Sequence, residues 1–265
     1  MAAISLPGQK TRALPLTGRH ALVTGGGTGI GRASASSLTA AGARVTVLGR
    51  RIAPLRAALK AGDAAFHAIV DLADEAAAVA ALAAAAAALG PVLLLVNAAG
   101  AAESAPFQKT DAAMFERMWR VNVAASVATT RAALPGMLHA GFGRVVNIAS
   151  TASLKGYRYV SAYVAAKHGL LGFTRALAQE VAGSGVTVNA VCPGFTDTDL
   201  VADSVARIVS RTGRTPDEAR ADLARNNPLG RLIRPEEVAA SVLYLCMPGS
   251  DAVNGQALAV DGGET

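Results

Sequence analysis

Tyr163 and Lys167 are four residues apart in an apolar stretch, and Tyr163 follows Ser150 by thirteen residues. On a helix, side chains four residues apart share one face, so the phenol and the ammonium would lie side by side. A nearby cation favours the phenolate and lowers the pKa of a tyrosine from its ordinary value of about 10. The pair could then act as a general acid and base. The same spacing also occurs by chance in ordinary helices, so this hypothesis depends on the rest of the chain.

A glycine-rich turn follows the apolar run His20–Thr24 and leads into a helical stretch. Glycines let the backbone approach a pyrophosphate, and the helix N-terminus supplies oriented N–H groups. Because this strand, turn and helix open an alternating series, the turn favours a dinucleotide. The alternative is a glycine-rich connector that binds nothing. The residues expected to contact the cofactor are Gly25, Thr28, Gly29, Ile30 and Gly31.

The end of the second apolar run carries Arg50 and Arg51, where many NAD sites place a carboxylate for the ribose. A guanidinium suits a 2′-phosphate, so Arg50 favours NADP(H) over NAD(H). Arg50 could instead stack on adenine or cap the strand. After the third run, Asp71 and the adjoining Leu72 are placed to meet the adenine. Asp71 could equally supply negative charge to the start of the next helix.

The composition excludes several classes of protein. The net charge is +6, but the arginines are scattered and no basic run is interleaved with aromatic residues, so we expect no nucleic-acid partner. The longest apolar segment, Ala76–Leu89, is shorter than the ~20 residues of a membrane span, so we expect no membrane association. Cys192 and Cys246 have no metal-ligand spacing and predict neither a disulfide framework nor a metal site. A reducing cytoplasm is the expected location.

Short apolar runs alternate with longer alanine-rich stretches along the chain. Runs that are apolar on both faces are typical of buried parallel strands. The alternation predicts an α/β fold, a doubly wound Rossmann-type parallel sheet of about seven strands with helices on both faces. Helices are expected over 29–41, 52–60, 74–89, 115–140, 157–182 and 235–247. The expected strands are His20–Thr24, Arg44–Leu48, Ala65–Val70, Val92–Val96, Arg144–Ile148, Val186–Val191 and Ala257–Val260.

No linker or repeat divides the chain, so we expect one domain over residues 17–265. Residues 1–16 lack the apolar core of a signal peptide and are expected to form an N-terminal extension. Residues 196–234 form a long polar connection between the sixth strand and the next helix. Connections of this length in compact domains are commonly functional, so we expect a substrate lid there.

Several motifs occur in one order along residues 17–263, nearly the whole chain. They are Thr24-Gly25-x3-Gly29-x-Gly31, Asn97-Ala98-Ala99-Gly100, Asn122, Ser150, Tyr163-x3-Lys167 and Pro193-Gly194. Together they resemble the short-chain dehydrogenase/reductase family in its compact single-domain branch. The glycine pattern differs from the more widespread Gly-x-Gly-x-x-Gly fingerprint, and this difference itself points to the family.

The resemblance implies a role for each matching position. Tyr163 would be the general acid and base, Lys167 would lower its pKa and bind the nicotinamide ribose, and Ser150 would bond the substrate oxygen. Asn122 would hold a water linking Lys167 to solvent, although it could be a core amide, and Ser150 could be a strand cap. The remaining implied cofactor contacts are Asn97, Ala98, Gly100, Pro193, Gly194, Thr196 and Thr198. The family also implies a homo-oligomer, commonly a tetramer.

The expected substrate is a small ketone or secondary alcohol that is mostly apolar. Its candidate contacts are Ala152, Leu154, Tyr157 and Phe195. The favoured function is an NAD(P)(H)-dependent oxidoreductase, a 3-oxoacyl or related ketone reductase. One alternative is an NAD-dependent alcohol or 3-hydroxyacyl dehydrogenase working oxidatively, and another is a non-catalytic dinucleotide sensor.

The predicted lid contains a set of arginines that could bind phosphates of a carrier-linked acyl group, such as a CoA or acyl carrier protein thioester. Alternatively, these arginines form a solvated face paired with Asp217, Glu218 and Asp222. The arginines concerned are Arg207, Arg211, Arg214, Arg220, Arg225, Arg231 and Arg234.

Overall fold

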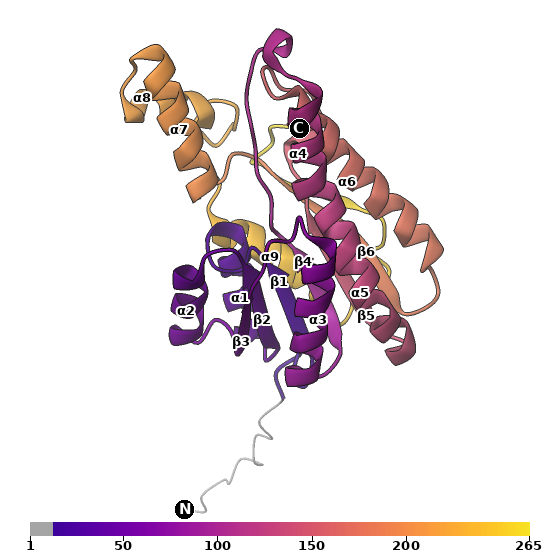
Figure 1. The fold of residues 1–265 in the computed structure, drawn as a ribbon. Helices are drawn as coiled ribbons and strands as arrows, with labels where there is room; N and C mark the ends of the chain where they lie inside the picture. Colours follow the sequence, from indigo (N-terminus) through magenta and orange to yellow (C-terminus); the bar gives the residue numbers. More distant parts are fainter. Residues whose placement is uncertain (1–12) are drawn as a thin grey trace, which may run out of the picture.

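The computed structural model describes residues 13–265. Its centre is a seven-stranded parallel sheet with the strand order β3-β2-β1-β4-β5-β6-β7 (Figure 1). The strands are β1 His20–Thr24, β2 Arg44–Gly49, β3 Phe66–Ile69, β4 Val92–Asn97, β5 Gly143–Ile148, β6 Val186–Pro193 and β7 Ala257–Val260. Each coincides with a predicted strand to within two residues. The order reverses between β1 and β4, and parallel α/β sheets bind ligands at the carboxyl edge beside such a switch.

Helices cover both faces of the sheet and enclose two apolar cores. Helices α1, α2 and α9 pack on one face, while α3, α5 and α6 cover the other (Figure 1). The predicted doubly wound fold is therefore confirmed. The helices are α1 Gly29–Ala40, α2 Ile52–Lys60, α3 Glu75–Leu89, α4 Ala112–Trp119, α5 Ala125–Ala140, α6 Ser161–Glu180, α7 Asp199–Thr212, α8 Pro216–Ala224 and α9 Pro235–Cys246.

Two helical regions differ from their predicted form. The expected helix over 115–140 consists of α4 and α5 joined by a π-helical turn at Arg120–Ala124. The expected lid contains two helices, α7 and α8, which project beyond the sheet (Figure 1). Thr215 and Glu218 form a reciprocal capping box at the start of α8, with Pro216 in its first turn. Both devices satisfy or remove free N–H groups at a helix start.

Most of the predicted extension, residues 1–16, lies outside the described part of the chain, which begins at residue 13. Leu16, by contrast, is fully buried in the core, and its N–H donates to the Ala41 carbonyl. Leu16 therefore packs with the folded domain. The composition of residues 1–16 does not reveal this contact, because it depends on one apolar side chain. Within residues 13–265, no helix has both the length and the hydropathy to cross a membrane.

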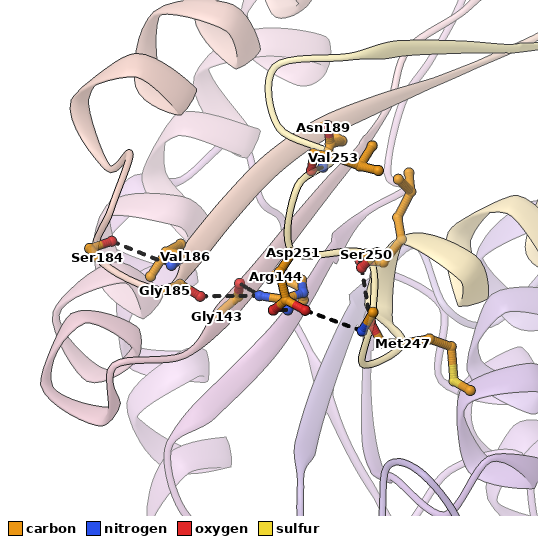
Figure 2. Close-up of polar contacts among 12 residues, drawn as sticks. Gly143, Arg144, Ser184, Gly185, Val186, Asn189, Met247, Ser250, Asp251 and Val253 are labelled. Atoms are coloured by element: carbon orange, nitrogen blue, oxygen red, sulfur yellow. Dashed lines mark hydrogen bonds and ion pairs between the residues drawn. The ribbon is translucent and has the colours of Figure 1, made fainter.

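Arg144, near the start of β5, is the largest fully buried side chain of the described residues. Its guanidinium donates to the carbonyls of Gly143 and Gly185 and forms an ion pair with Asp251 at 2.5 Å (Figure 2). Phe142 lies beneath it, with the guanidinium carbon 4.3 Å from the ring centre. This cluster joins β5 to the segments before β6 and after α9, at the amino edge of the sheet.

Candidate active site

Ser150, Tyr163 and Lys167 meet at the carboxyl edge of the sheet. Ser150 follows β5, where its Oγ accepts a hydrogen bond from the Ala152 N–H and begins a short 3₁₀ turn, Thr151–Ser153. Tyr163 and Lys167 lie on successive turns of α6, and the Ser150 side chain is close enough to Tyr163 to lower the pKa of its hydroxyl. Lys167 is buried, and its Nζ lies 5.7 Å from the Tyr163 ring centre. Three groups suited to proton transfer are thus brought together.

Burial governs the electrostatics of this cluster. Removal from water raises the pKa of Tyr163, and the nearby Ser150 side chain only partly offsets the increase. This direction is opposite to the one expected from Lys167, because burial is the largest cause of the shift. The same burial lowers the pKa of Lys167 to about 8, and its Nζ donates to the Ile148 carbonyl at 2.8 Å. Tyr163 therefore holds its proton as a neutral phenol at neutral pH.

Asn122 lies in the π-helical turn between α4 and α5 and faces the same cluster. Its Nδ2 donates to the carbonyls of Ala101 and Met118 at 2.9 and 3.0 Å, so its amide is satisfied within the protein. A Cβ on Gly100 would lie 2.9 Å from Asn122 Oδ1 and 3.7 Å from Lys167 Nζ. Gly100 therefore permits Asn122 and Lys167 to approach the same stretch of backbone. π-Turns of this kind often occur at functional sites.

Asn97 ends β4 and is a buried structural residue in this geometry. Its Oδ1 accepts from the Thr129 hydroxyl at 2.7 Å, and its Nδ2 donates to Asn147 Oδ1 at 2.9 Å. The following N–H groups of Ala98 and Ala99 donate to Thr24 Oγ1, which ties the ends of β1 and β4 together. This network steadies the sheet edge, and only the backbone of the segment 98–100 faces the candidate site.

The glycine turn has the form that a pyrophosphate requires. A Cβ on Gly31 would lie 2.3 Å from the Gly25 carbonyl oxygen, and one on Gly26 would lie 2.5 Å from the Val47 side chain. The backbone is thus packed where a side chain would exclude it. Helix α1 begins with no acidic residue in its first turn and no side-chain cap from Thr28. Its N–H groups are free to bind an anion, so these residues fit a dinucleotide.

The second predicted cofactor region lies at the ends of β2 and β3. Arg50 is exposed beyond β2, and the neighbouring Arg51 forms an ion pair with Asp199 of α7 at 3.2 Å. Asp71 accepts from the Ala73 N–H and does not begin the helix, because Asp74 caps α3. The carboxylate of Asp71 is exposed, and its second oxygen could be reached by adenine. The Leu72 side chain is buried in the core, so only its backbone can face a ligand.

The segment after β6 lies opposite the glycine turn. Gly194 donates to the Val260 carbonyl, and Thr196 Oγ1 donates to the Gly194 carbonyl at 3.0 Å. Thr198 precedes α7, and its Cγ2 occupies the space that a Cβ on Gly29 would need, at 2.9 Å. The predicted cofactor residues from Pro193 to Thr198 thus border the predicted phosphate loop across the sheet edge.

The predicted substrate residues do not all present side chains to an open site. Ala152 is buried, and Leu154 packs in the core that contains Met118. Tyr157 and Phe195 meet edge to face with ring centres 6.1 Å apart. Phe195 also packs against Val201, Ala224 and Leu232, so it connects the lid to the site.

Most of the lid arginines form ion pairs with carboxylates. For those residues, this agrees with the alternative that they form a solvated face and do not bind phosphate. The partners differ from those expected, since Asp197 and Glu237 contribute in place of Asp217 and Glu218. Arg207 instead donates to Ser204 Oγ, and Arg211 is exposed. The ion pairs are Arg214 and Arg225 with Asp222, Arg220 with Asp197, and Arg231 and Arg234 with Glu237.

Two residues near the site, Glu264 and Thr129, were not predicted from the sequence. Glu264 is buried against Tyr157 and Lys155, with one carboxylate oxygen 2.5 Å from the Tyr157 hydroxyl. Nothing in the sequence around Glu264 indicates this position, because it depends on segment 261–265 folding back onto residues 151–157. Thr129 was not predicted for the same reason, since its hydroxyl donates to Asn97, far away in sequence. Thr24 was part of the predicted glycine motif, but its bond to the backbone after β4 was not predicted.

Comparisons with known proteins agree with this geometry. Residues 19–208 match the family model described as short chain dehydrogenase. The chain is 39% identical to a putative ketoacyl reductase of Streptomyces coelicolor, covering 92% of this chain and 95% of the relative. It is 34% identical to a D-beta-hydroxybutyrate dehydrogenase of Cupriavidus necator, covering 94% and 98%. A crystal structure of an actinorhodin polyketide ketoreductase variant with NADPH superposes with a TM-score of 0.89 at 37% identity, covering 93% and 97%.

The fold, the clustered side chains and these similarities define the class. The chain belongs to the short-chain dehydrogenase family, as the motifs predicted. It is an NAD(P)-dependent oxidoreductase that interconverts ketones and alcohols.

Proposed function

We propose that the protein reduces the ketone of a 3-oxoacyl derivative or a related apolar ketone, with Tyr163 as proton donor. The supporting observation is that Ser150, Tyr163 and buried Lys167 lie together at the sheet edge that carries the glycine turn. The nicotinamide cofactor supplies the hydride when bound, and the protein supplies the proton and the orientation.

Each side chain has a separate task in this proposal. Ser150 donates a hydrogen bond to the carbonyl oxygen and stabilises the charge that develops there. Tyr163 gives its proton to the same oxygen, and its raised pKa keeps that proton in place until the carbonyl arrives. Lys167 stabilises the phenolate that Tyr163 becomes. Asn122, whose Oδ1 and the nearby Lys167 Nζ both face Gly100, holds the path by which Lys167 regains a proton from solvent.

The proposed cofactor is NADP(H). Arg50 is exposed at the end of β2, and no carboxylate stands between Val47 and Arg51 to bond ribose hydroxyls or repel a phosphate. An arginine can bind a 2′-phosphate through paired charge-assisted hydrogen bonds. The structural relative with NADPH supports the same choice.

The proposed substrate is a neutral ketone, with a carrier-linked acyl group as the form to test first. The similarity to a ketoacyl reductase supports this class. Arg207 and Arg211 are the lid arginines without an ion pair among residues 13–265, so we propose them as the contacts of a carrier phosphate. The similarity to D-beta-hydroxybutyrate dehydrogenase favours, as second candidate, oxidation of a 3-hydroxy acid with NAD.

A panel of ketones, acyl thioesters and secondary alcohols, assayed with both nicotinamide cofactors, tests the proposal. Turnover is followed by the absorbance of the reduced nicotinamide. We expect the highest kcat/KM with a 3-oxoacyl thioester and NADPH. Faster oxidation of a 3-hydroxy acid with NAD would support the second candidate instead. Binding of either cofactor without turnover of any substrate would favour a dinucleotide sensor.

We also propose that the protein works in the cytoplasm as a homo-oligomer, a tetramer by family resemblance. Both cysteines are buried free thiols, which suits a reducing compartment. An apolar groove of about 470 Å³ on α4 and α6 supports association. Trp119 lines this groove and remains half exposed. Light scattering of the purified protein gives the number of subunits directly.

A further inference from the structure

The carboxylate of Glu264 is buried next to the loop that follows Ser150. Its side chain is 1% exposed, and Oε1 accepts a hydrogen bond from the Tyr157 hydroxyl at 2.5 Å. The same oxygen forms an ion pair with Lys155 at 3.1 Å. Oε2 is also buried, yet it has no hydrogen-bond partner among the described residues. Because buried polar atoms are almost always paired, this oxygen requires an explanation.

The free oxygen lies between the two segments proposed to enclose the substrate and the nicotinamide. On one side, Tyr157 is hydrogen-bonded to the hydroxyl of Thr151, the residue directly after Ser150, at 2.7 Å. On the other side is the backbone of Gly194, where a Cβ would lie 3.2 Å from Glu264 Oε2. Glycine at position 194 therefore lets the carboxylate pack closely against this stretch of backbone.

The region around this oxygen carries net negative charge. Asp261 is buried and accepts hydrogen bonds from the backbone N–H groups of Gly263 and Thr265, which fix segment 261–265 in place. Lys155 forms an ion pair with Glu264 but with no second carboxylate among residues 13–265. The pKa of Tyr157 is raised, first by burial and further by its hydrogen bond to Glu264 and the charges of Glu264 and Asp261.

We propose that Glu264 determines substrate specificity by charge. Its negative charge, which no partner among the described residues balances at Oε2, repels a carboxylate of the substrate and does not repel a neutral acyl group. Such a site discriminates by what it rejects. The inference rests on the proposed function and narrows the substrate to neutral acyl derivatives, such as amides, esters and thioesters, as opposed to free 3-oxo acids.

Acetoacetamide and acetoacetate test this directly, because they have nearly the same shape and differ in charge and in N–H donors. Methyl acetoacetate provides a neutral substrate without a donor. For the unaltered protein we expect kcat/KM for the amide to exceed that for the carboxylate by about tenfold or more, as like charges disfavour binding. In Glu264→Gln, this ratio should fall by about tenfold. The ester is also neutral, so it should resemble the amide in the unaltered protein.

Glu180→Gln is the matched control, since Glu180 is exposed at the far end of α6. This variant should keep the ratio of the unaltered protein. Equal use of acetoacetate and acetoacetamide by the unaltered protein would overturn the inference, even if Glu264→Gln did not fold. An unchanged ratio in Glu264→Gln, or an increase only in KM for the cofactor, would also overturn it. Absence of turnover with all three ketones would contradict the proposed function itself.

Discussion

At the scale of single residues, the candidate site depends on a buried lysine and a buried phenol. The sequence places Tyr163 and Lys167 on one helix face, and α6 has them there. The sequence could not predict their electrostatics, because burial depends on the surrounding elements. In the folded protein, burial lowers the pKa of Lys167 and raises the pKa of Tyr163. The first expected consequence is a pH dependence.

Carbonyl reduction should slow in alkaline solution. The pKa of Lys167 is lowered to about 8, so its positive charge is present below that pH and lost above it. The neutral amine no longer stabilises the phenolate that Tyr163 forms on giving up its proton. We expect kcat/KM for reduction to fall as the pH rises through about 8, measured at constant ionic strength. A constant kcat/KM from about pH 6 to 10 would contradict a role for the ammonium.

Arg50 should decide the choice of cofactor. Arg50→Ala removes a charge-assisted contact of about 1.5–3 kcal/mol, so KM for NADPH should rise by about tenfold to a hundredfold. KM for NADH should change little, because NADH has no 2′-phosphate. Arg56→Ala, one turn into the adjacent α2, is the control variant. Equal effects on both cofactors would show that Arg50 stacks on adenine or holds the strand end.

At the scale of elements, the glycine turn and the lid show what sequence patterns can and cannot predict. The central strands were predictable because both of their faces are buried, which requires continuous apolar runs. Helix α8 carries its own start signal in Thr215, Pro216 and Glu218, whereas the polarity of the connection indicates only a loop. The position of Thr198 against Gly29 joins segments far apart in sequence, so no local pattern reveals it.

The turn itself offers a paired test. In Gly31→Ala, the new Cβ would lie 2.3 Å from the Gly25 carbonyl, so the loop must shift at a cost of about 1–3 kcal/mol. Cofactor affinity, measured by fluorescence titration, should fall together with the melting temperature. In Gly172→Ala, the Cβ meets nothing within 4 Å on the exposed face of α6. That variant should gain about 0.5–1 kcal/mol of stability and bind cofactor normally. Equal behaviour of the two variants would contradict the packing argument.

At the scale of the whole molecule, the two edges of the sheet have different tasks. The candidate site lies at the carboxyl edge, while the cluster of Arg144 lies at the amino edge (Figure 2). The fold class followed from the alternation of elements. The buried Arg144 and the folding of segment 261–265 did not, because both depend on partners about a hundred residues away.

Arg144 should therefore matter for stability and not for chemistry. Arg144→Ala removes a fully buried charge and leaves its hydrogen-bond partners without that donor. The free energy of unfolding should fall by about 3 kcal/mol. Arg131→Ala breaks an exposed ion pair with Glu75 and should change it by about 0.5 kcal/mol at most. Denaturant unfolding measures both values. A loss of kcat/KM per folded molecule in Arg144→Ala would contradict this separation of the two edges.

The central claim is that the Tyr163 hydroxyl supplies the proton, and Tyr163→Phe tests it most directly. Single-turnover reduction and NADPH binding are measured on the same preparation, with Tyr244→Phe, an exposed position of α9, as control. We predict that Tyr163→Phe lowers the rate by about a hundredfold to ten thousandfold while NADPH affinity changes little. A rate in Tyr163→Phe equal to that of Tyr244→Phe would contradict the account.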